Sequence, residues 1–273
     1  RTVLRRESGS NPADLVDYRE ITEALGGSYL DLTDGRNRIN VLEPRMWSAE
    51  DKEPDPEAPA AFQSGSVLSQ HIAFLRDFFR SYKPFTEAEI DTIEIMLGRL
   101  YDSRGLRDDT DYSRLSPRDY PILSDLYDQM DAEYQRVRTG SGGELYTPEL
   151  LRSACLGLHS MCKGADAKFF NGHTNIHDTR LITFGVKDLM EGGKNIKDAM
   201  LFNVLSYINH ALIAGGNAAG IFEELHVFLS NPVAVSYIRS AMKRVRKRDS
   251  LIGLASQNIE DFLLPGVAEM TKP

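Results

Sequence analysis

Apolar residues between about positions 66 and 163 recur every third or fourth residue, which is the spacing of an amphipathic helix. Several helix starts carry their own signals. "TEAE" at 86–89 has the sequence of a capping box, and Pro117 and Pro148 follow hydroxyl residues at the first helical position. The predicted stripes are Leu68, Ile72, Leu75, Phe79 and Tyr82; Ile90, Ile93, Leu97 and Leu100; Ile122, Leu126, Met130 and Tyr134; and Leu151, Ala154, Leu158 and Cys162.

On both sides of this helical stretch, short apolar runs alternate with helical segments. "ADLVD" and "SYLDL" on the amino side predict strands around a helix that stops at "LGG". On the carboxyl side, strands are predicted at 180–186, 218–222 and 250–256, with helices at 195–213 and 232–247. This alternation predicts an α/β fold with a mostly parallel sheet.

The pattern divides the chain into a core interrupted by an insertion. We expect residues 1–48 and 164–273 to form the α/β core and residues 66–163 to form an all-helical insertion. Residues 49–65 begin with the acidic, proline-rich run "AEDKEPDPEAPA" and are predicted to be an exposed linker.

Composition and charge narrow the class of protein. The 273 residues are 41% hydrophobic and carry a net charge of −8, which argues against attraction of the whole surface to nucleic acid or anionic lipid. No run approaches the ~18 apolar residues of a membrane span, and no signal-peptide pattern opens the sequence. Cys155 and Cys162, if on one helix, lie roughly 10 Å apart, too far for a disulfide, so we expect reduced thiols that suit a cytoplasm.

The most informative short motif is "GIFEEL", an apolar strand that ends in Glu223 and Glu224. Ligands of parallel α/β sheets bind beyond the carboxyl ends of the strands. One carboxylate there can hold Mg²⁺ while its neighbour orients an attacking water. The alternative is that the two acids only favour the start of the next helix, where negative charge is stabilising.

Two further motifs suit the same site, and each has a simpler alternative. Gln257 follows the next predicted strand, where its amide can sense a γ-phosphate, or the segment is an ordinary polar helix cap. "KRVRKR" at 243–248 contains Arg244 and Arg246, candidates for an arginine finger toward a neighbouring subunit or for a nucleic-acid contact. The alternative there is a solvated helix end. His173 and His177 have a metal-pair spacing, but nothing around them supports zinc.

No G-x-x-x-x-G-K-[ST] sequence occurs among these residues. "RESGSN" and "TGSGGE" contain glycines without the Lys-Ser/Thr that must follow, and "GGKN" has only the lysine. The sequence therefore predicts no phosphate-binding loop within the 273 residues.

The order of the motifs resembles the C-terminal ATPase domain of the conjugal-transfer and type IV secretion ATPases, the CagE/TrbE/VirB family. "LVDYREITEALGGSYLDLTDGRNRINVLEP" is similar to the family's "D-P-E-x-E-Y…LGG…INPL" run, with Asp17 at its Asp. "HIAFLRDFF" and "LSPRDYPILSDLY" resemble its helical insertion, and "GADAKFFNGHTNI" a segment before the next strand. "GIFEELHVFLSNP", "AMKRVRKRD" and "LASQNIEDFL" resemble its Walker B strand, arginine-rich helix and sensor strand, in that order.

The resemblance implies a RecA/FtsK-like P-loop NTPase core with an all-helical insertion. It implies an ATP- and Mg²⁺-dependent hexameric motor, peripheral to the bacterial inner membrane, that works with other type IV secretion components. Glu223 would serve Mg²⁺, Glu224 would polarise water, Gln257 would sense the γ-phosphate, Arg244 or Arg246 would reach a neighbouring subunit, and Asp17 would lie at the nucleotide.

The sequence departs from the family in three respects. Glu223–Glu224 replaces the usual Asp-Glu pair, "DYRE" lacks the Pro-Glu after the Asp, and the phosphate loop would have to precede residue 1. We therefore expect a fragment that is inactive alone, from a parent ATPase. Two alternatives stay open, a non-hydrolysing scaffold relative and a DNA translocase or coupling protein of the same superfamily.

Overall fold

The structure of the chain is a computed structural model. It describes residues 2–5, 18–48, 56–63, 65–141, 145–176, 179–186, 193–223, 225–229, 231–263 and 267. The strand predicted at 13–17, and with it Asp17, lies outside these residues, as does Glu224. Among the described residues, no helix is both long and apolar enough to cross a membrane.

Five parallel strands form one sheet in the order β2-β3-β1-β4-β5, which confirms the predicted parallel sheet. Three of the strands coincide with the predicted apolar runs on the carboxyl side, and "SYLDL" contains the second strand. The bounds are β1 Thr2–Arg5, β2 Ser28–Asp31, β3 Ile182–Gly185, β4 Ala219–Phe222 and β5 Leu251–Leu254.

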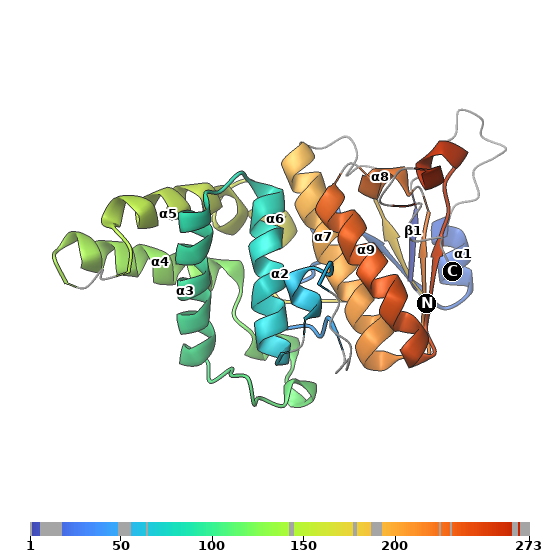
Figure 1. Ribbon diagram of the computed structural model, residues 1–273, viewed down its shortest axis with the longest axis horizontal. Helices are drawn as coiled ribbons and strands as arrows, with labels where there is room; N and C mark the ends of the chain where they lie inside the picture. Colours follow the sequence, from blue (N-terminus) through green and yellow to red (C-terminus); the bar gives the residue numbers. More distant parts are fainter. Residues whose placement is uncertain are drawn as a thin grey trace.

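Helices cover the two faces of the sheet unequally. α1 (Tyr18–Ala24) packs on β2 and β3, and the hydroxyls of Thr22 and Thr183 lie 2.7 Å apart. Phe184, the next residue of β3, points to the opposite face and packs edge-on against Tyr207 of α7 (Lys194–His210). α9 (Pro232–Val245) lies beside α7 and also packs on β5 (Figure 1).

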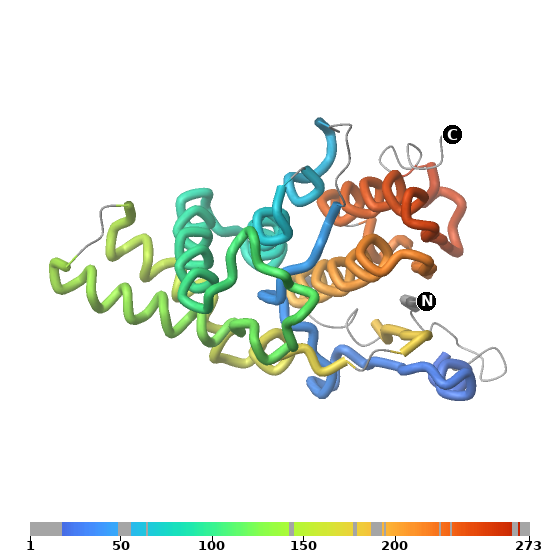
Figure 2. Tube along the Cα trace, turned by 90° about the horizontal axis from the view of Figure 1, so that it is seen from below, coloured from blue at the N-terminus to red at the C-terminus, as the bar shows by residue number. Residues whose placement is uncertain are grey.

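The helical half of the molecule, defined here as α2–α5, stands beside the sheet half rather than over it (Figures 1 and 2). The sheet half comprises the strands with α1, α7, α8 and α9. All of the helical half lies in the chain between β2 and β3, and α2 packs on α7 as well as on α3. Its helices are α2 Val67–Tyr82, α3 Glu87–Ser103, α4 Leu123–Arg138 and α5 Pro148–Cys162.

Shorter helical pieces join these elements. They are η1 Ala60–Phe62, η2 Tyr112–Arg114, η3 Pro117–Asp119, α6 Ala167–Phe170, η5 Ala211–Gly215, α8 His226–Leu229, η6 Arg246–Arg248 and η7 Ile259–Leu263.

Helix starts in the helical half follow the predicted signals closely. Thr86 and Glu89 form both bonds of a capping box at the start of α3, and the Thr147 hydroxyl accepts from the Leu150 N–H at the start of α5. Cys155 and Cys162 both lie on α5, are buried and are free thiols, as expected. Burial raises the pKa of the Cys155 thiol to about 11, which keeps it protonated and unreactive.

The helix predicted to start at Pro117, in "SPRD" at 116–119, does not begin there. Ser116 and Asp119 do form a capping box, but it closes only the 3₁₀ turn η3. Pro121 disfavours helical backbone at the residue before it, so the chain leaves the turn at Tyr120 in an extended conformation. α4 then begins at Leu123, with Ile122 as its N-cap instead of a member of the buried stripe.

Residues 39–48, just before the predicted linker at 49–65, form a buried segment, whereas residues 49–55 of that linker lie outside the described residues. Residues 39–48 run between α2 and α7, where side chains from both helices hold their backbone. Gln70 accepts from the N–H groups of Trp47 and Ser48, and Asn203 donates to the Ile39 carbonyl. Part of the predicted linker is also packed, because Phe62 is buried against Trp47.

Candidate functional site

Glu223 lies where β4 ends, between the ends of the neighbouring strands β1 and β5. Phe222, just before it, is buried against α8, which anchors the strand end. The Glu223 side chain is half-buried and accepts a hydrogen bond of 3.0 Å from the hydroxyl of Tyr18, the first residue of α1. The carboxylate is therefore held where the parallel strands have their carboxyl ends, a side of the sheet that we call the carboxyl edge.

Tyr18 is a residue of this site that the sequence did not indicate. It lies 205 positions from Glu223, and no local pattern links two residues so far apart. The parallel arrangement of β1 and β4 brings α1 to the strand end that carries the acid. We assign Tyr18 the task of orienting the Glu223 carboxylate.

The carboxyl end of β5 lies beside the carboxyl end of β4. The Ala255 N–H donates to the Phe222 carbonyl at 2.8 Å, and the Leu225 N–H donates to the Ala255 carbonyl at 3.0 Å. These bonds bind the segment on either side of the acidic pair to the end of β5. Gln257 follows two residues later and is exposed at the same edge as Glu223. The predicted proximity of these two strand ends is therefore present.

The basic helix end lies at the opposite edge of the sheet. α9 starts near the carboxyl edge and runs back over 14 residues, about 21 Å. The Arg248 carbonyl accepts from the Asn217 N–H just before β4 begins, so residues 246–248 lie at the amino edge. No arginine of this segment can therefore act on the site of its own chain.

The two candidate arginines have different surroundings. Arg244 is buried, donates to the Ser240 carbonyl at 3.0 Å and lies over the Phe62 ring at 5.0 Å. Arg246 is exposed. A contact with a neighbouring subunit stays a prediction for both, but only Arg246 has the exposure that the contact requires.

Glu223 is the candidate metal ligand that the described residues place at this end of the strands. In the described part of the chain, no three His, Cys, Asp or Glu side chains form a group that could hold a metal ion. Mg²⁺ in nucleotide sites is commonly held by one or two carboxylates together with phosphate oxygens and water, so Glu223 is chemically suited to that role. Its use as a Mg²⁺ ligand, and the roles of Glu224, Gln257 and Asp17, stay predictions.

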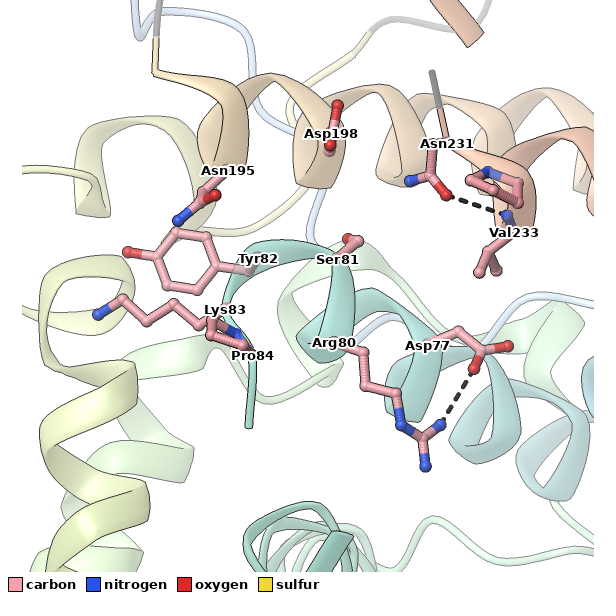
Figure 3. Close-up of a pocket in the computed structure, with 11 residues that line it drawn as sticks. Asp77, Arg80, Ser81, Tyr82, Lys83, Pro84, Asn195, Asp198, Asn231 and Val233 are labelled. Carbon is pink, nitrogen blue, oxygen red and sulfur yellow. Dashed lines mark hydrogen bonds and ion pairs between the residues drawn. The ribbon is translucent and has the colours of Figure 1, made fainter. Parts of the chain in front are cut away.

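A cleft of about 370 Å³ separates the end of α2 from the starts of α7 and α9. Figure 3 shows Asn195, Asp198 and Asn231 on one side of it and Ser81 and Tyr82 on the other. Its polar groups largely bind other parts of the chain. Tyr82 donates to Asp166, Lys83 donates to the Gly157 carbonyl, and Asp77 accepts from Tyr237 and Arg80. The cleft marks the joint between the two halves.

Similarity to a known protein comes from the comparison with solved structures. No protein-family model matches the sequence, and no curated protein matches it. Among solved structures, VirB4 of Thermoanaerobacter pseudethanolicus matches with a TM-score of 0.77 and 26% sequence identity. The match covers 98% of this chain and 65% of the VirB4 chain, so this chain spans less than two thirds of that protein's length.

Proposed function

We propose, from the premise that this chain is a VirB4/TrbE-type secretion ATPase domain, that it carries the acidic side of a nucleotide site. The site lies at the carboxyl edge of the sheet, where Glu223 and Gln257 follow the neighbouring strands β4 and β5. ATP with Mg²⁺ is the ligand that this arrangement suits. The whole protein would be an ATPase of a type IV secretion system.

Each candidate residue would have a separate role, set by the chemistry of its side chain. Glu223, oriented by Tyr18, would hold Mg²⁺ through a carboxylate oxygen. Glu224 would orient the attacking water and accept its proton. Gln257 would bond the γ-phosphate through its side-chain amide. The 273 residues contain no phosphate-loop sequence, so binding of the β and γ phosphates would need residues from outside them.

The position of Glu223 supports this proposal most strongly. An acid at the end of a strand flanked on both sides by parallel strands lies where α/β sheets bind their ligands. The competing explanation is a helix-start acid, but α8 after the pair has only four residues, so its dipole is small.

We extend the proposal to the assembly through the family. The motor would be a hexamer at the inner face of the bacterial inner membrane, serving a conjugative secretion channel. Arg246 would act across the subunit boundary, since it lies at the edge of the sheet away from its own chain's site.

Two substitutions in the whole protein test the catalytic proposal. Glu224→Gln should keep nucleotide binding and lower ATP turnover by roughly 10²–10⁴, the usual contribution of a positioned general base. Glu223→Gln should also lower turnover, but higher Mg²⁺ should partly restore it because the variant weakens a hard oxygen ligand.

Turnover and melting temperature together separate the explanations. If the acids only favour α8, each substitution changes stability by at most about 1 kcal/mol and leaves turnover within a few-fold. Near-normal turnover of Glu224→Gln would remove the proposed role. A wild-type protein that binds ATP without turnover would instead support the scaffold alternative.

A further inference from the structure

The buried segment of residues 39–48, here called the strap, belongs to no helix or strand. Its backbone groups therefore need partners from elsewhere, because a buried N–H or C=O group without a hydrogen bond is costly. Most of the bonds that it makes end on side chains. The N–H groups of Trp47 and Ser48, for example, both donate to Oε1 of Gln70 on α2, each at 3.0 Å.

Side chains of both halves bind the backbone of the strap. They are Gln70, His71 and Tyr101 from the helical half and Asn203, Asn209 and His210 from α7 of the sheet half. The strap also binds α7 through a side chain of its own, because the Arg45 guanidinium donates to the Ser206 hydroxyl at 3.2 Å. A change in the angle between the halves therefore strains bonds to the strap on one side or the other.

The halves also contact each other directly, through aromatic side chains. The ring of Phe74 on α2 lies 5.2 Å from that of Phe202 on α7, and Trp47 of the strap packs against both Phe74 and Tyr237 of α9. Apolar contacts are non-directional and permit small sliding movements of packed helices, whereas a hydrogen bond weakens steeply when its angle is distorted. The bonds of the strap are therefore the contacts that specify one orientation.

The strap and the cleft described above lie at opposite ends of the joint. The strap binds α2 at Gln70 and His71, near the start of that helix, and it binds α7 at Asn203 and His210, in the second half of that helix. The cleft lies at the end of α2 and at the starts of α7 and α9. Gln70 and Tyr82 of the cleft are about 18 Å apart along α2. The joint is thus held by the strap at one end and is open at the other.

Near the cleft, a hydrogen bond of 2.9 Å crosses the joint from the Tyr237 hydroxyl of α9 to the Asp77 carboxylate of α2. Asp77 also pairs with Arg80 of its own helix at 3.1 Å, so the carboxylate keeps a partner if the bond to Tyr237 is lost. Loss of the Gln70 side chain, by contrast, removes the acceptor of two buried N–H groups at once. The two connections therefore differ in how much they resist a change of angle.

We propose that the strap fixes the angle between the helical half and the sheet half, and that its release lets the helical half rotate at the cleft while both halves stay folded. The movement needs no change within a helix or the sheet, because the bonds that must break end on side chains. The proposal involves no nucleotide, so its failure and the failure of the proposed function are separate results.

The distance between two spin labels, one in each half, measures this angle. Leu156→Cys on α5 and Leu251→Cys on β5 provide exposed positions, and the native thiols are buried and contribute little. In the 273-residue chain we expect a single narrow distribution of distances. Gln70→Leu removes the bonds to Trp47 and Ser48 and should widen this distribution at least about twofold.

Gln129→Leu is the matched control for this substitution. The Gln129 amide donates to the Met96 carbonyl at 2.7 Å, a bond between a side chain and the backbone that lies wholly within the helical half. Its loss should lower stability and leave the width of the distance distribution as it is in the wild type.

Asn203→Leu releases the strap from the other half. The Nδ2 group of Asn203 donates to the Ile39 carbonyl at 2.8 Å, and its Oδ1 has no hydrogen-bond partner among the described residues, so the variant breaks one hydrogen bond. It should also widen the distribution. Because it perturbs the core less than Gln70→Leu, it decides the question if Gln70→Leu does not fold.

Amide hydrogen exchange in α4 and α5 shows whether the helical half stays folded in each variant. Widening in Gln70→Leu or Asn203→Leu, with these helices as protected as in the wild type, supports the proposal. Equal widths in both variants and in Gln129→Leu would contradict it, and so would widening that appears only with loss of protection in α4 and α5. A wider distribution in Tyr237→Phe than in Gln70→Leu would also contradict it, because the bond at the cleft would then set the angle.

Discussion

The helical half and the sheet half differ in how completely each buries its own side chains. In the helical half, Phe74, Met130 and Leu158 are fully buried, and the helix ends carry their own caps. In the sheet half, Phe222 is buried while its neighbour Ile221 is not, and carboxylate and amide groups collect at one edge. The core and helix ends of the helical half are satisfied by contacts within the chain, whereas the sheet half leaves Ile221 of β4 exposed and gathers polar groups where its strands end.

The largest expected effect is the loss of folding stability when a core aromatic side chain of the helical half is removed. Phe74 is fully buried and packs against Trp47, Phe202 and Tyr237 at ring distances of 4.8, 5.2 and 6.4 Å. Phe74→Ala should lower the free energy of unfolding by about 3–5 kcal/mol, measured by urea denaturation.

Leu156→Ala on the exposed side of α5 is the control, with a change within about 0.5 kcal/mol. Equal effects of the two substitutions would mean that the joint between the halves is not closely packed. The comparison between a complete and an open region would then fail.

The histidines packed between the halves, His71 and His210, predict a loss of stability in acid. The Met46 N–H donates to Nδ1 of His210 at 3.0 Å, and burial, with Arg45 nearby, lowers the pKa of His210 to about 4. The unfolded chain takes up this proton near the ordinary pKa of 6.5, so stability is full above that pH and declines as pH falls toward 4. The loss between pH 7 and pH 5 should be roughly 2 kcal/mol from His210.

His210→Asn keeps a hydrogen-bond acceptor for Met46 and removes the titration. Urea denaturation at both pH values should show a smaller loss in this variant. His71, whose pKa burial also lowers, accounts for the loss that remains. An unchanged pH dependence in His210→Asn would contradict the assignment.

The smallest predicted effect concerns the bond between Tyr18 and Glu223. Tyr18→Phe removes a hydroxyl that donates to a half-buried carboxylate, a bond worth about 1 kcal/mol. In the whole protein we expect a few-fold higher Mg²⁺ requirement for turnover, because the ligand is less well oriented. A larger effect than that of Glu223→Gln, or none, would contradict an orienting role.

Most helices and strands could be predicted from the sequence, because the signals that define them are local. Capping at Thr86 and Thr147 and the apolar runs of β3, β4 and β5 depend on neighbouring residues, and they were predicted correctly. The helix predicted at "SPRD" forms only a 3₁₀ turn, because the effect of Pro121 on the backbone outweighed the capping box. The packing of Phe62 inside a polar, proline-rich segment depends on Trp47, Tyr237 and Arg244, which only the tertiary structure brings to it.

The site divides in the same way. Glu223 and Gln257 were found because each follows an apolar strand, and the parallel pairing of β4 with β5 places both at one edge. Tyr18 was not found, since its contact with Glu223 depends on which elements meet across the sheet. The burial of Arg244 was also missed, because a basic run looks like an exposed helix end until its neighbours are known.

Calorimetric titration of the 273-residue chain with ATP and Mg²⁺ tests the central claim most directly. Backbone N–H groups and a lysine of a phosphate loop provide most phosphate contacts in such sites, and these residues contain no such sequence. We predict no saturable binding up to about 1 mM ATP, which corresponds to a binding free energy weaker than about −4 kcal/mol. A micromolar dissociation constant would contradict the account, because it would show that the sheet half already holds a complete nucleotide site.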